Sequence, residues 1–328
     1  MPFPATVIIP CRSLDRLTQR CVAECRARVP GPIIVVPDAD AEEGPADPRI
    51  TVLPSGPASP AAKRNLAARA AATEFLAFID SDARPLAGWP ARAVEILEQD
   101  ASLGAVGGPA IPVADGSASR RAVANAQRSV LLSGPYAYRK RRAGARDCAS
   151  LSSCNMILRR GVYLRVGGMD ERFFVGEDNV FCGALVAAGL RLRFDPGVAV
   201  EHRARDLRGL LLQGLCVGAV AWREFVARPS IDFWCYLGSA SLLIGLGLGW
   251  LLFFMPPLGW LYALVAALYG GACVVEAVRL SGRVSDIPRT FAALVVGSLA
   301  PGLGVVLSLF GLRLNPAKVY TDAGQEST

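Results

Sequence analysis

Three groups of residues in this sequence have side chains that could do chemistry together. Asp80 and Asp82 lie one residue apart at the end of the apolar run FLAFIDSDARP. Glu177 and Asp178 are adjacent, and His202 is the only histidine in the chain. Carboxylates combined with an imidazole suit a divalent cation of the Mg²⁺ or Mn²⁺ type, and the imidazole favours Mn²⁺. A carboxylate can also serve as a general base.

Each group also has a purely structural interpretation. Asp-Ser-Asp stabilises turns through side-chain bonds to the backbone, and on these three residues alone the two interpretations weigh equally. Glu177 and Asp178 follow a glycine at a predicted helix start, where acids complement the helix dipole. That explanation suffices for Glu177, whereas Asp178 is the better candidate base. A single histidine such as His202 is more often a packing or solvent-exposed residue.

The elements that must position these residues follow from the apolar pattern. Over residues 1–200, short apolar runs alternate with helical patterns, and the runs predicted to be strands are 6–10, 32–36, 50–53 and 75–79. They are continuously apolar, as expected for parallel strands covered on both faces. Ser59 is a plausible N-cap with Pro60 at the first helical position. The pattern predicts an α/β fold with a mostly parallel, doubly wound sheet, whose ligands bind beyond the carboxyl ends of the strands.

The C-terminal part is long and apolar enough for membrane helices. Asp232 and Glu276 enclose 43 residues without a charge, and Arg289 and Arg313 enclose another 23. A membrane helix needs about 20 apolar residues, so the first stretch holds two spans and the second holds one. The predicted spans are 233–255, 256–275 and 290–312. Pro301 could instead mark a kink or a re-entrant hairpin, so residues 233–313 are expected to contain two to three transmembrane helices.

Basic residues near these spans predict their orientation. Arg279, Arg283 and Arg289 lie between the second and third spans, whereas the turn after the first span carries no charge. The positive-inside rule then puts the N-terminal region in the cytoplasm. A full third span would place Arg313 and Lys318 on the other side, against the rule. The expected location is the inner (cytoplasmic) membrane, as a multi-pass protein with its catalytic domain facing the cytoplasm.

Composition narrows the partners. No signal peptide is predicted, because the start MPFPATVIIPCR lacks a basic n-region. The nine cysteines show no metal-type pairing and are expected to be reduced packing residues. The net charge of +7 suits contact with anionic membrane lipids. No nucleic-acid partner is expected, because the basic residues are not interleaved with aromatic ones.

Two further segments have predicted roles near the membrane. Residues 120–146 are strongly basic and include YRKRR at 138–142, which indicates a solvated loop or a contact with lipid phosphate or a phosphorylated substrate. Residues 207–225 are expected to form an amphipathic interface helix that leads into the first span.

Taken in order, the motifs resemble the family 2 glycosyltransferases, which have the nucleotide-sugar-binding GT-A fold. The matching segments are TVIIPCR, IIVVPDAD, SPAAKRNLA, FLAFIDSDARP, AVGGP, SSCNMILRR, VGGMDERFFVGEDNVFC and LRFDPGVAVEHRAR. The resemblance covers about residues 6–228 and is strongest to the membrane-anchored bacterial branch that builds surface polysaccharides or glycolipids. It divides the chain into a GT-A catalytic domain (1–205), an amphipathic interface helix (206–232), a membrane region (233–313) and a tail (314–328).

The resemblance implies a role for each candidate residue. Asp80 would contact the ribose or the metal, and Asp82 and His202 would ligate the Mn²⁺ or Mg²⁺ that bridges the donor diphosphate. Asp178 would deprotonate the acceptor hydroxyl. Further contacts with the donor are implied for Pro10 and Arg12 (nucleotide pocket), Asp38 (base), Arg64 (base or phosphate) and Glu177. A UDP-sugar is the expected donor.

Two positions depart from the family pattern. The second strand of relatives often ends in two acids, but here Pro37 takes the first place and leaves Asp38 alone. The base of the donor nucleotide is therefore open. Many relatives also carry a glutamine followed three residues on by arginine and an aromatic residue, whereas Gln213 is followed by Cys216 and Val217. Contacts with the acceptor are therefore expected to differ from the usual ones.

The predicted function is inverting, metal-dependent transfer of a sugar from a nucleotide-sugar donor to a lipid-linked or membrane-proximal acceptor in surface polysaccharide or glycolipid synthesis. One alternative is a synthase that loads polyprenyl phosphate, with residues 139–142 receiving the phosphate. Another is a catalytically inactive, membrane-tethered scaffold. A processive polymer synthase is not expected, because three spans are too few to line a channel. The sequence does not predict the sugar, the acceptor, the linkage or the oligomeric state.

Overall fold

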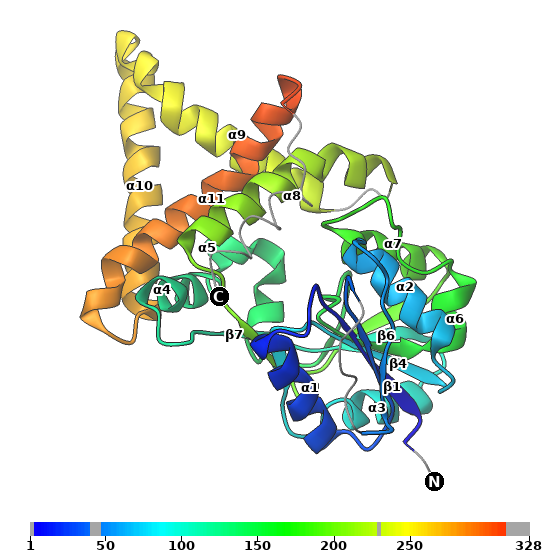
Figure 1. Cartoon of the computed structure of the whole chain (residues 1–328). Coiled ribbons are helices and arrows are strands. Elements are labelled where there is room, and N and C mark those ends of the chain that lie inside the picture. The colour runs from blue at the N-terminus through cyan, green and yellow to red at the C-terminus, as the bar shows by residue number, and fades with distance from the viewer. Residues whose placement is uncertain (1–2, 40–46, 228–230, 313–328) are drawn as a thin grey trace. The chain divides into compact units, whose positions relative to one another are not determined.

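The structure is a computed structural model that describes residues 3–39, 47–227 and 231–312 (Figure 1). The chain forms two compact units that are interleaved along the sequence. The sheet unit comprises Met1–Ile111 and Tyr138–Arg203, and the helical unit comprises Pro112–Ala137 and Ala204–Thr328. Residues 112–137, which we expected inside a catalytic domain of residues 1–205, therefore group with the C-terminal helices.

The sheet unit is built on an eight-stranded mixed sheet with the order β3-β2-β1-β4-β9-β6-β10-β8. Its strands are β1 (Ala5–Pro10), β2 (Ile33–Val36), β3 (Ile50–Val52), β4 (Phe75–Ile79), β6 (Leu103–Gly107), β8 (Arg146–Cys148), β9 (Asn155–Arg159) and β10 (Arg191–Phe194). Strands β3, β2, β1 and β4 are parallel neighbours, whereas β9 runs antiparallel to β4 and β6. The four predicted strands and the α/β fold class are confirmed.

Helices cover both faces of this sheet (Figure 1). The covering helices are α1 (Arg16–Arg28) and α3 (Ala91–Gln99) on one face, and α2 (Pro60–Ala70), α6 (Arg160–Arg165) and α7 (Glu177–Ala187) on the other. Side chains of α1 and α3 pack with Ile79 and its alternate neighbours in β4. Phe78, which points the other way, contacts Tyr163 of α6 at 5.4 Å between ring centroids. Successive strand residues face opposite sides, so a strand buried on both faces must be apolar throughout.

Local capping fixes where the helices at the carboxyl edge begin. Ser59 Oγ accepts a hydrogen bond from the Ala62 backbone at 3.2 Å, with Pro60 at the first helical position, as predicted. Helix α7 begins after Gly176, whose φ of 83° lies in the left-handed region that favours glycine. This turn places Glu177 in the first turn of α7.

A second sheet of three strands brings a distant segment to the end of β4. Its order is β5 (Ala83–Pro85), β11 (Val200–Arg203) and β7 (Ala110–Val113). Strands β5 and β11 are antiparallel, with His202 opposite Ala83. Because β5 follows directly after the Asp80–Asp82 turn, this register delivers His202 to that turn.

The helical unit contains three helices that could cross a membrane. Its helices are α4 (Ala118–Ala126), α5 (Val130–Ser133), α8 (Leu207–Ala227), α9 (Ile231–Leu248), α10 (Pro256–Leu280) and α11 (Ile287–Leu309). The segments that are long and apolar enough are Phe233–Phe254, Pro256–Leu280 and Val284–Leu309. They overlap the three predicted spans and indicate association with a membrane. The tail 314–328, together with Arg313 and Lys318, lies outside the described residues.

Helix α11 passes through Pro301 without turning back. The helix is held together there by Ser239 of α9, whose Oγ accepts from the Gly302 backbone at 2.8 Å and donates to the Ser298 carbonyl at 2.5 Å. A hydroxyl inserted beside a proline restores the backbone hydrogen bonding that the helix loses. The third apolar segment is therefore one continuous helix, and not the re-entrant hairpin that the sequence left open.

Helix α8 packs along α11 through small residues. Gly214 and Gly218 lie four residues apart on α8, and a Cβ added to Gly218 would be 1.9 Å from the Pro301 carbonyl oxygen. Small residues at this spacing let two helix backbones approach closely. The helix predicted for residues 207–225 is present, and one side of it faces α11.

Candidate active site

Asp80 and Asp82 lie at the carboxyl edge of the sheet, directly after the buried strand β4. The turn that holds them is closed by the backbone, because the Ala83 N–H donates to the Asp80 carbonyl at 3.0 Å. Both carboxylate side chains are 32% exposed. The turn interpretation and the ligand interpretation therefore coexist, since the backbone closes the turn and the carboxylates reach solvent.

His202 joins these two carboxylates. Its Nε2 lies 3.1 Å from Asp82 Oδ1 and 3.8 Å from Asp80 Oδ2. Two ligands that each lie about 2.1 Å from one ion are at most about 4.2 Å apart. Each of the two carboxylates is therefore close enough to His202 to share a divalent cation with it, and the donor types of the three residues fit Mn²⁺ or Mg²⁺.

A cysteine that the sequence reasoning missed lies at the same place. The Sγ atom of Cys154 and ligand atoms of Asp80 and His202 all lie within 4.8 Å of one another. Cys154 is only 4% exposed, and burial raises the pKa of its thiol above the ordinary value. Cys154 directly precedes β9, and the antiparallel pairing of β9 with β4 places Asn155 opposite Ile79 and so brings Cys154 close to Asp80.

Arg64 of α2 connects the end of β4 with the start of α7. Its Nη2 donates to Asp80 Oδ1 at 2.7 Å, and its Nη1 donates to Glu177 Oε1 at 2.9 Å. Arg64 is 2% exposed, so this cation is buried between two carboxylates. The carboxylates of Asp80, Glu177 and Asp178 outnumber the two guanidiniums that interact with them, those of Arg64 and Arg139.

Glu177 and Asp178 lie together at the start of α7. Burial raises the pKa of Glu177 to about 7, and neighbouring Asp178 adds to this rise while Arg64 opposes it. The Asp178 carboxylate is oriented by the backbone: Oδ2 accepts from the Ser153 N–H at 3.2 Å and Oδ1 from the Asn179 N–H at 2.9 Å. A carboxylate held in a fixed position next to Glu177 is a candidate general base.

The residues predicted to contact the nucleotide lie after β1 and β2, and a second missed residue joins them. Lys63, buried and adjacent to Arg64, donates from Nζ to the Cys11 carbonyl and to Asp38 Oδ1. The Asp38 N–H donates to the Arg12 carbonyl at 2.9 Å. Lys63 therefore connects the loop after β1 with the loop after β2. The feature of the sequence that could have indicated this role is the pair of adjacent basic residues, Lys63 and Arg64, in SPAAKRNLA.

The positions of the remaining candidates complete this edge. Pro10 is the buried last residue of β1, and Arg12 is exposed just beyond it. All the candidate site residues belong to the sheet unit and follow the carboxyl ends of β1, β2 and β4 or lie on α2, α7 and β11. Gln213, by contrast, belongs to α8, where its Oε1 accepts from Arg205 Nε at 3.2 Å.

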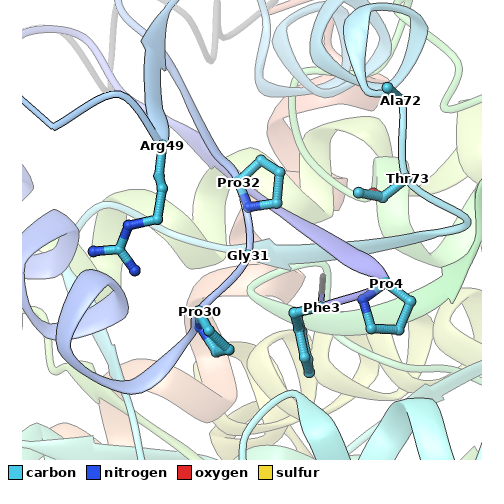
Figure 2. Close-up of a pocket in the computed structure, with 8 residues that line it drawn as sticks. All are labelled: Phe3, Pro4, Pro30, Gly31, Pro32, Arg49, Ala72 and Thr73. Carbon is cyan, nitrogen blue, oxygen red and sulfur yellow. The ribbon is translucent and has the colours of Figure 1, made fainter. Parts of the chain in front are cut away.

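A hollow of about 550 Å³ lies at the opposite edge of the sheet (Figure 2). Its lining residues are Phe3, Pro4, Pro30, Gly31, Pro32, Arg49, Ala72 and Thr73. These residues precede the strands β1, β2, β3 and β4, so the hollow is at their amino ends. Its lining is mostly apolar and includes no acid, and the guanidinium of Arg49 is paired with Asp47 at 2.8 Å. The ligand set described above lies at the other edge.

The mixed sheet with helices on both faces has the GT-A fold. A mannosyltransferase from Pyrobaculum calidifontis, solved in complex with GDP-mannose and Mn²⁺, superposes with a TM-score of 0.56 over 94% of this chain and 88% of that chain, at 16% identity. Residues 7–167 match the family model described as Glycosyl transferase family 2. The chain belongs to the family 2 glycosyltransferases.

Curated relatives come from two strains of Mycobacterium tuberculosis. Both are named pre-mycofactocin glycosyltransferase and are 31% identical to this chain over 230 residues. The match covers 67% of this chain and 45% of each relative. The chain therefore spans less than half the length of the curated relatives that it matches.

Proposed function

We propose that this chain transfers a sugar from a nucleotide-sugar donor to a lipid-linked or membrane-proximal acceptor, with inversion at the anomeric carbon. The observation that carries the proposal is the grouping of Asp80, Asp82 and His202 beside the oriented carboxylate of Asp178. Family membership supports it, as do the relatives named glycosyltransferases and the fold neighbour solved with GDP-mannose and Mn²⁺.

The donor side depends on a divalent cation. Asp82 and His202 would hold it, with Asp80 as a further ligand or a contact to the ribose. When bound, the cation stabilises the negative charge that builds on the departing nucleoside diphosphate. Arg64 orients Asp80 from behind, and Lys63 orients Asp38 for recognition of the base. A UDP-sugar remains the expected donor.

The acceptor side depends on Asp178. Its carboxylate takes the proton of the acceptor hydroxyl, which then attacks the anomeric carbon from the face opposite the leaving group. Both of its oxygens accept hydrogen bonds from backbone N–H groups, so the carboxylate is positioned by the backbone and not by another side chain. A single displacement needs one base for the acceptor hydroxyl and one site for the leaving group. Such a displacement inverts the configuration of the anomeric carbon.

The acceptor is expected at a membrane because the chain carries three helices long and apolar enough to cross one. A net charge of +7 also favours contact with anionic lipid. We further propose that the protein is a multi-pass protein of the inner membrane, with the sheet unit on the cytoplasmic side, since Arg279, Arg283 and Arg289 lie between two of these helices.

A donor screen tests the proposal. The purified full chain is incubated with UDP-, GDP- and dTDP-sugars in the presence of Mn²⁺ or Mg²⁺, and nucleotide release and thermal stabilisation are measured. One nucleotide class is expected to stabilise the protein in a metal-dependent way and to be turned over when acceptor lipid is supplied. If no donor binds or reacts, the chain is an inactive membrane-tethered scaffold.

One observation favours a second function, the loading of polyprenyl phosphate. Arg139 opens the basic stretch 139–142, and its Nη2 donates to Asn179 Oδ1 at 3.2 Å. Asn179 follows the candidate base Asp178, so this stretch begins where an acceptor phosphate would lie. Radiolabel from the donor that appears in a mild-acid-labile polyprenyl monophosphate establishes this function. Label in an acid-stable glycolipid excludes it.

A further inference from the structure

The carboxyl edge of the sheet contains a sulfur atom, that of Cys154, that the sequence pattern did not predict there. Ligand atoms of Asp80, His202 and Cys154 form the group described above, all within 4.8 Å of one another. We propose that Cys154 is a ligand of the divalent cation, so that the site binds thiophilic ions such as Co²⁺, Zn²⁺ and Cd²⁺ more tightly than Mg²⁺. The inference deepens the proposed function and rests on it only for the presence of a cation at this edge.

The distances fit a shared ion after a small adjustment. Metal–sulfur bonds are about 2.3 Å and metal–nitrogen or metal–oxygen bonds about 2.1 Å, so a sulfur and an oxygen on one ion lie at most about 4.4 Å apart. A side-chain movement of a few tenths of an ångström brings the widest separation into that range. The set of one carboxylate, one imidazole and one thiol suits borderline and soft ions, whereas Mg²⁺ prefers oxygen alone.

Neighbouring residues hold Cys154 in this position. The side chain of Asn155, fully buried, accepts from Trp89 Nε1 at 2.8 Å and donates to the Val198 carbonyl at 2.8 Å. On the other side, the Ser153 N–H donates to Asp178. These bonds fix the backbone on either side of Cys154 and therefore the direction of its side chain.

Simple packing is the competing explanation, because Cys154 also belongs to the apolar core cluster. Cys21 provides the contrast: it is buried in the same cluster, and its thiol contacts the Asp80 main-chain carbonyl at 3.4 Å. A packed thiol is indifferent to added cation. A ligand thiol forms a metal–sulfur bond and releases its proton to solvent. A bound ion with a metal–sulfur absorption band therefore distinguishes the two roles.

Cobalt absorption separates these roles. Co²⁺ is added to the purified full chain, and the near-ultraviolet band for charge transfer from sulfur to cobalt is recorded for the wild type, Cys154→Ala and Cys21→Ala. The band is expected in the wild type and in Cys21→Ala and is expected to be absent in Cys154→Ala, with thermal melts confirming that each variant is folded. A wild type without the band, or a Cys154→Ala variant that keeps it, overturns the proposal.

Calorimetric affinities give a second readout. Cys154→Ser is expected to weaken Cd²⁺ binding by about 10–100-fold while changing Mg²⁺ binding by no more than about twofold. Equal losses for both ions would mean that the substitution damages the site generally, which also overturns the ligand role. A wild type that turns over donor without a cobalt–sulfur band refutes the ligand role alone. A wild type with the band but without nucleotide release refutes the transferase alone.

Discussion

The sheet unit and the helical unit both bury charged side chains, but they balance the charges differently. At the sheet edge, Arg64 serves both Asp80 and Glu177, and Asp178 adds a third carboxylate, which interacts with the second cation, Arg139. In the helical unit, Asp286 is 3% exposed, and its carboxylate accepts hydrogen bonds from Nε and Nη2 of Arg121, each at 3.3 Å. Arg283 and Arg289 also interact electrostatically with this carboxylate, so no excess of negative charge is left there.

A second carboxylate of the helical unit, that of Glu276, is also paired with a cation. Glu276 of α10 accepts from Ser129 Oγ at 2.6 Å and from Arg279 Nε at 2.7 Å. Buried carboxylates without enough opposing charge disfavour the folded state, whereas a bound cation offsets that cost. The surplus at the sheet edge therefore indicates a ligand, and the balance in the helical unit indicates packing between helices.

The largest expected effect concerns Asp178, the proposed base. Asp178→Asn is expected to lower kcat by about 10²–10⁴-fold, because no general base is left to accept the proton of the acceptor hydroxyl. Donor binding, measured by calorimetry, is expected to stay unchanged. Asp147→Asn, which removes an exposed carboxylate of β8, serves as the control and should keep full activity. Turnover that survives in Asp178→Asn assigns the base to another residue.

Removing the central cation of each unit sharpens the comparison. Arg64→Met is expected to cost about 3–5 kcal/mol of folding stability, because it leaves two carboxylates without their buried partner. Arg121→Met is expected to cost about 1–3 kcal/mol, because a single carboxylate loses its partner. Saturating Mn²⁺ should restore part of the loss in Arg64→Met and none in Arg121→Met, as followed by thermal melting. Equal rescue of both variants would remove the distinction between the units.

Stability without added metal should depend on pH through Glu177. Its pKa is raised from 4.5 to about 7, so the folded protein holds this proton more tightly than the unfolded chain does. The resulting stabilisation is complete below pH 4.5 and is lost as the pH rises to about 7, an effect of about 1–3 kcal/mol. Denaturant titrations across this range should show the decline in the wild type and a flatter profile in Glu177→Gln. Identical profiles would contradict the burial of this carboxyl group.

The smallest expected effect lies in the helical unit. Ser239→Ala removes the hydroxyl that restores the backbone bonding of α11 beside Pro301. Interhelical hydrogen bonds in membrane proteins contribute about 0.6 kcal/mol on average, so the melting temperature should fall only slightly. Ser241→Ala is the matched control, because the Ser241 hydroxyl that it removes donates to the Leu237 carbonyl of the same helix. A loss in Ser239→Ala as large as that of Arg64→Met would show that the helical unit depends on this bond.

The sequence was sufficient for the features that depend on local pattern. Continuous apolar runs predicted β1, β2 and β4, because strands covered on both faces leave little room for polar residues. The edge strand β3 was predicted in the same way, although its residues are only partly buried or exposed. Ser59 with Pro60 marked the start of α2 through its cap. The long uncharged stretches similarly predicted three apolar helices.

The sequence was insufficient where contacts join distant segments. The approach of His202 to Asp82 depends on the register between β5 and β11, and Cys154 reaches Asp80 only through the order of the sheet strands. Residues 112–137 join the helical unit through contacts such as Arg121 with Asp286, which are 165 residues apart. No local pattern encodes such pairs, so the roles of the site residues stay predictions.

One measurement tests most directly whether the charge surplus of the sheet edge holds a cation for catalysis. Mn²⁺ is titrated by calorimetry into the full chain in the presence of a nucleoside diphosphate, for the wild type, Asp82→Asn, His202→Asn and the control Asp147→Asn. The wild type and the control are expected to bind Mn²⁺ equally well, and the two site variants to bind it about 10–100-fold more weakly. Equal Mn²⁺ affinity in all four proteins would contradict the assignment of this edge as the cation site.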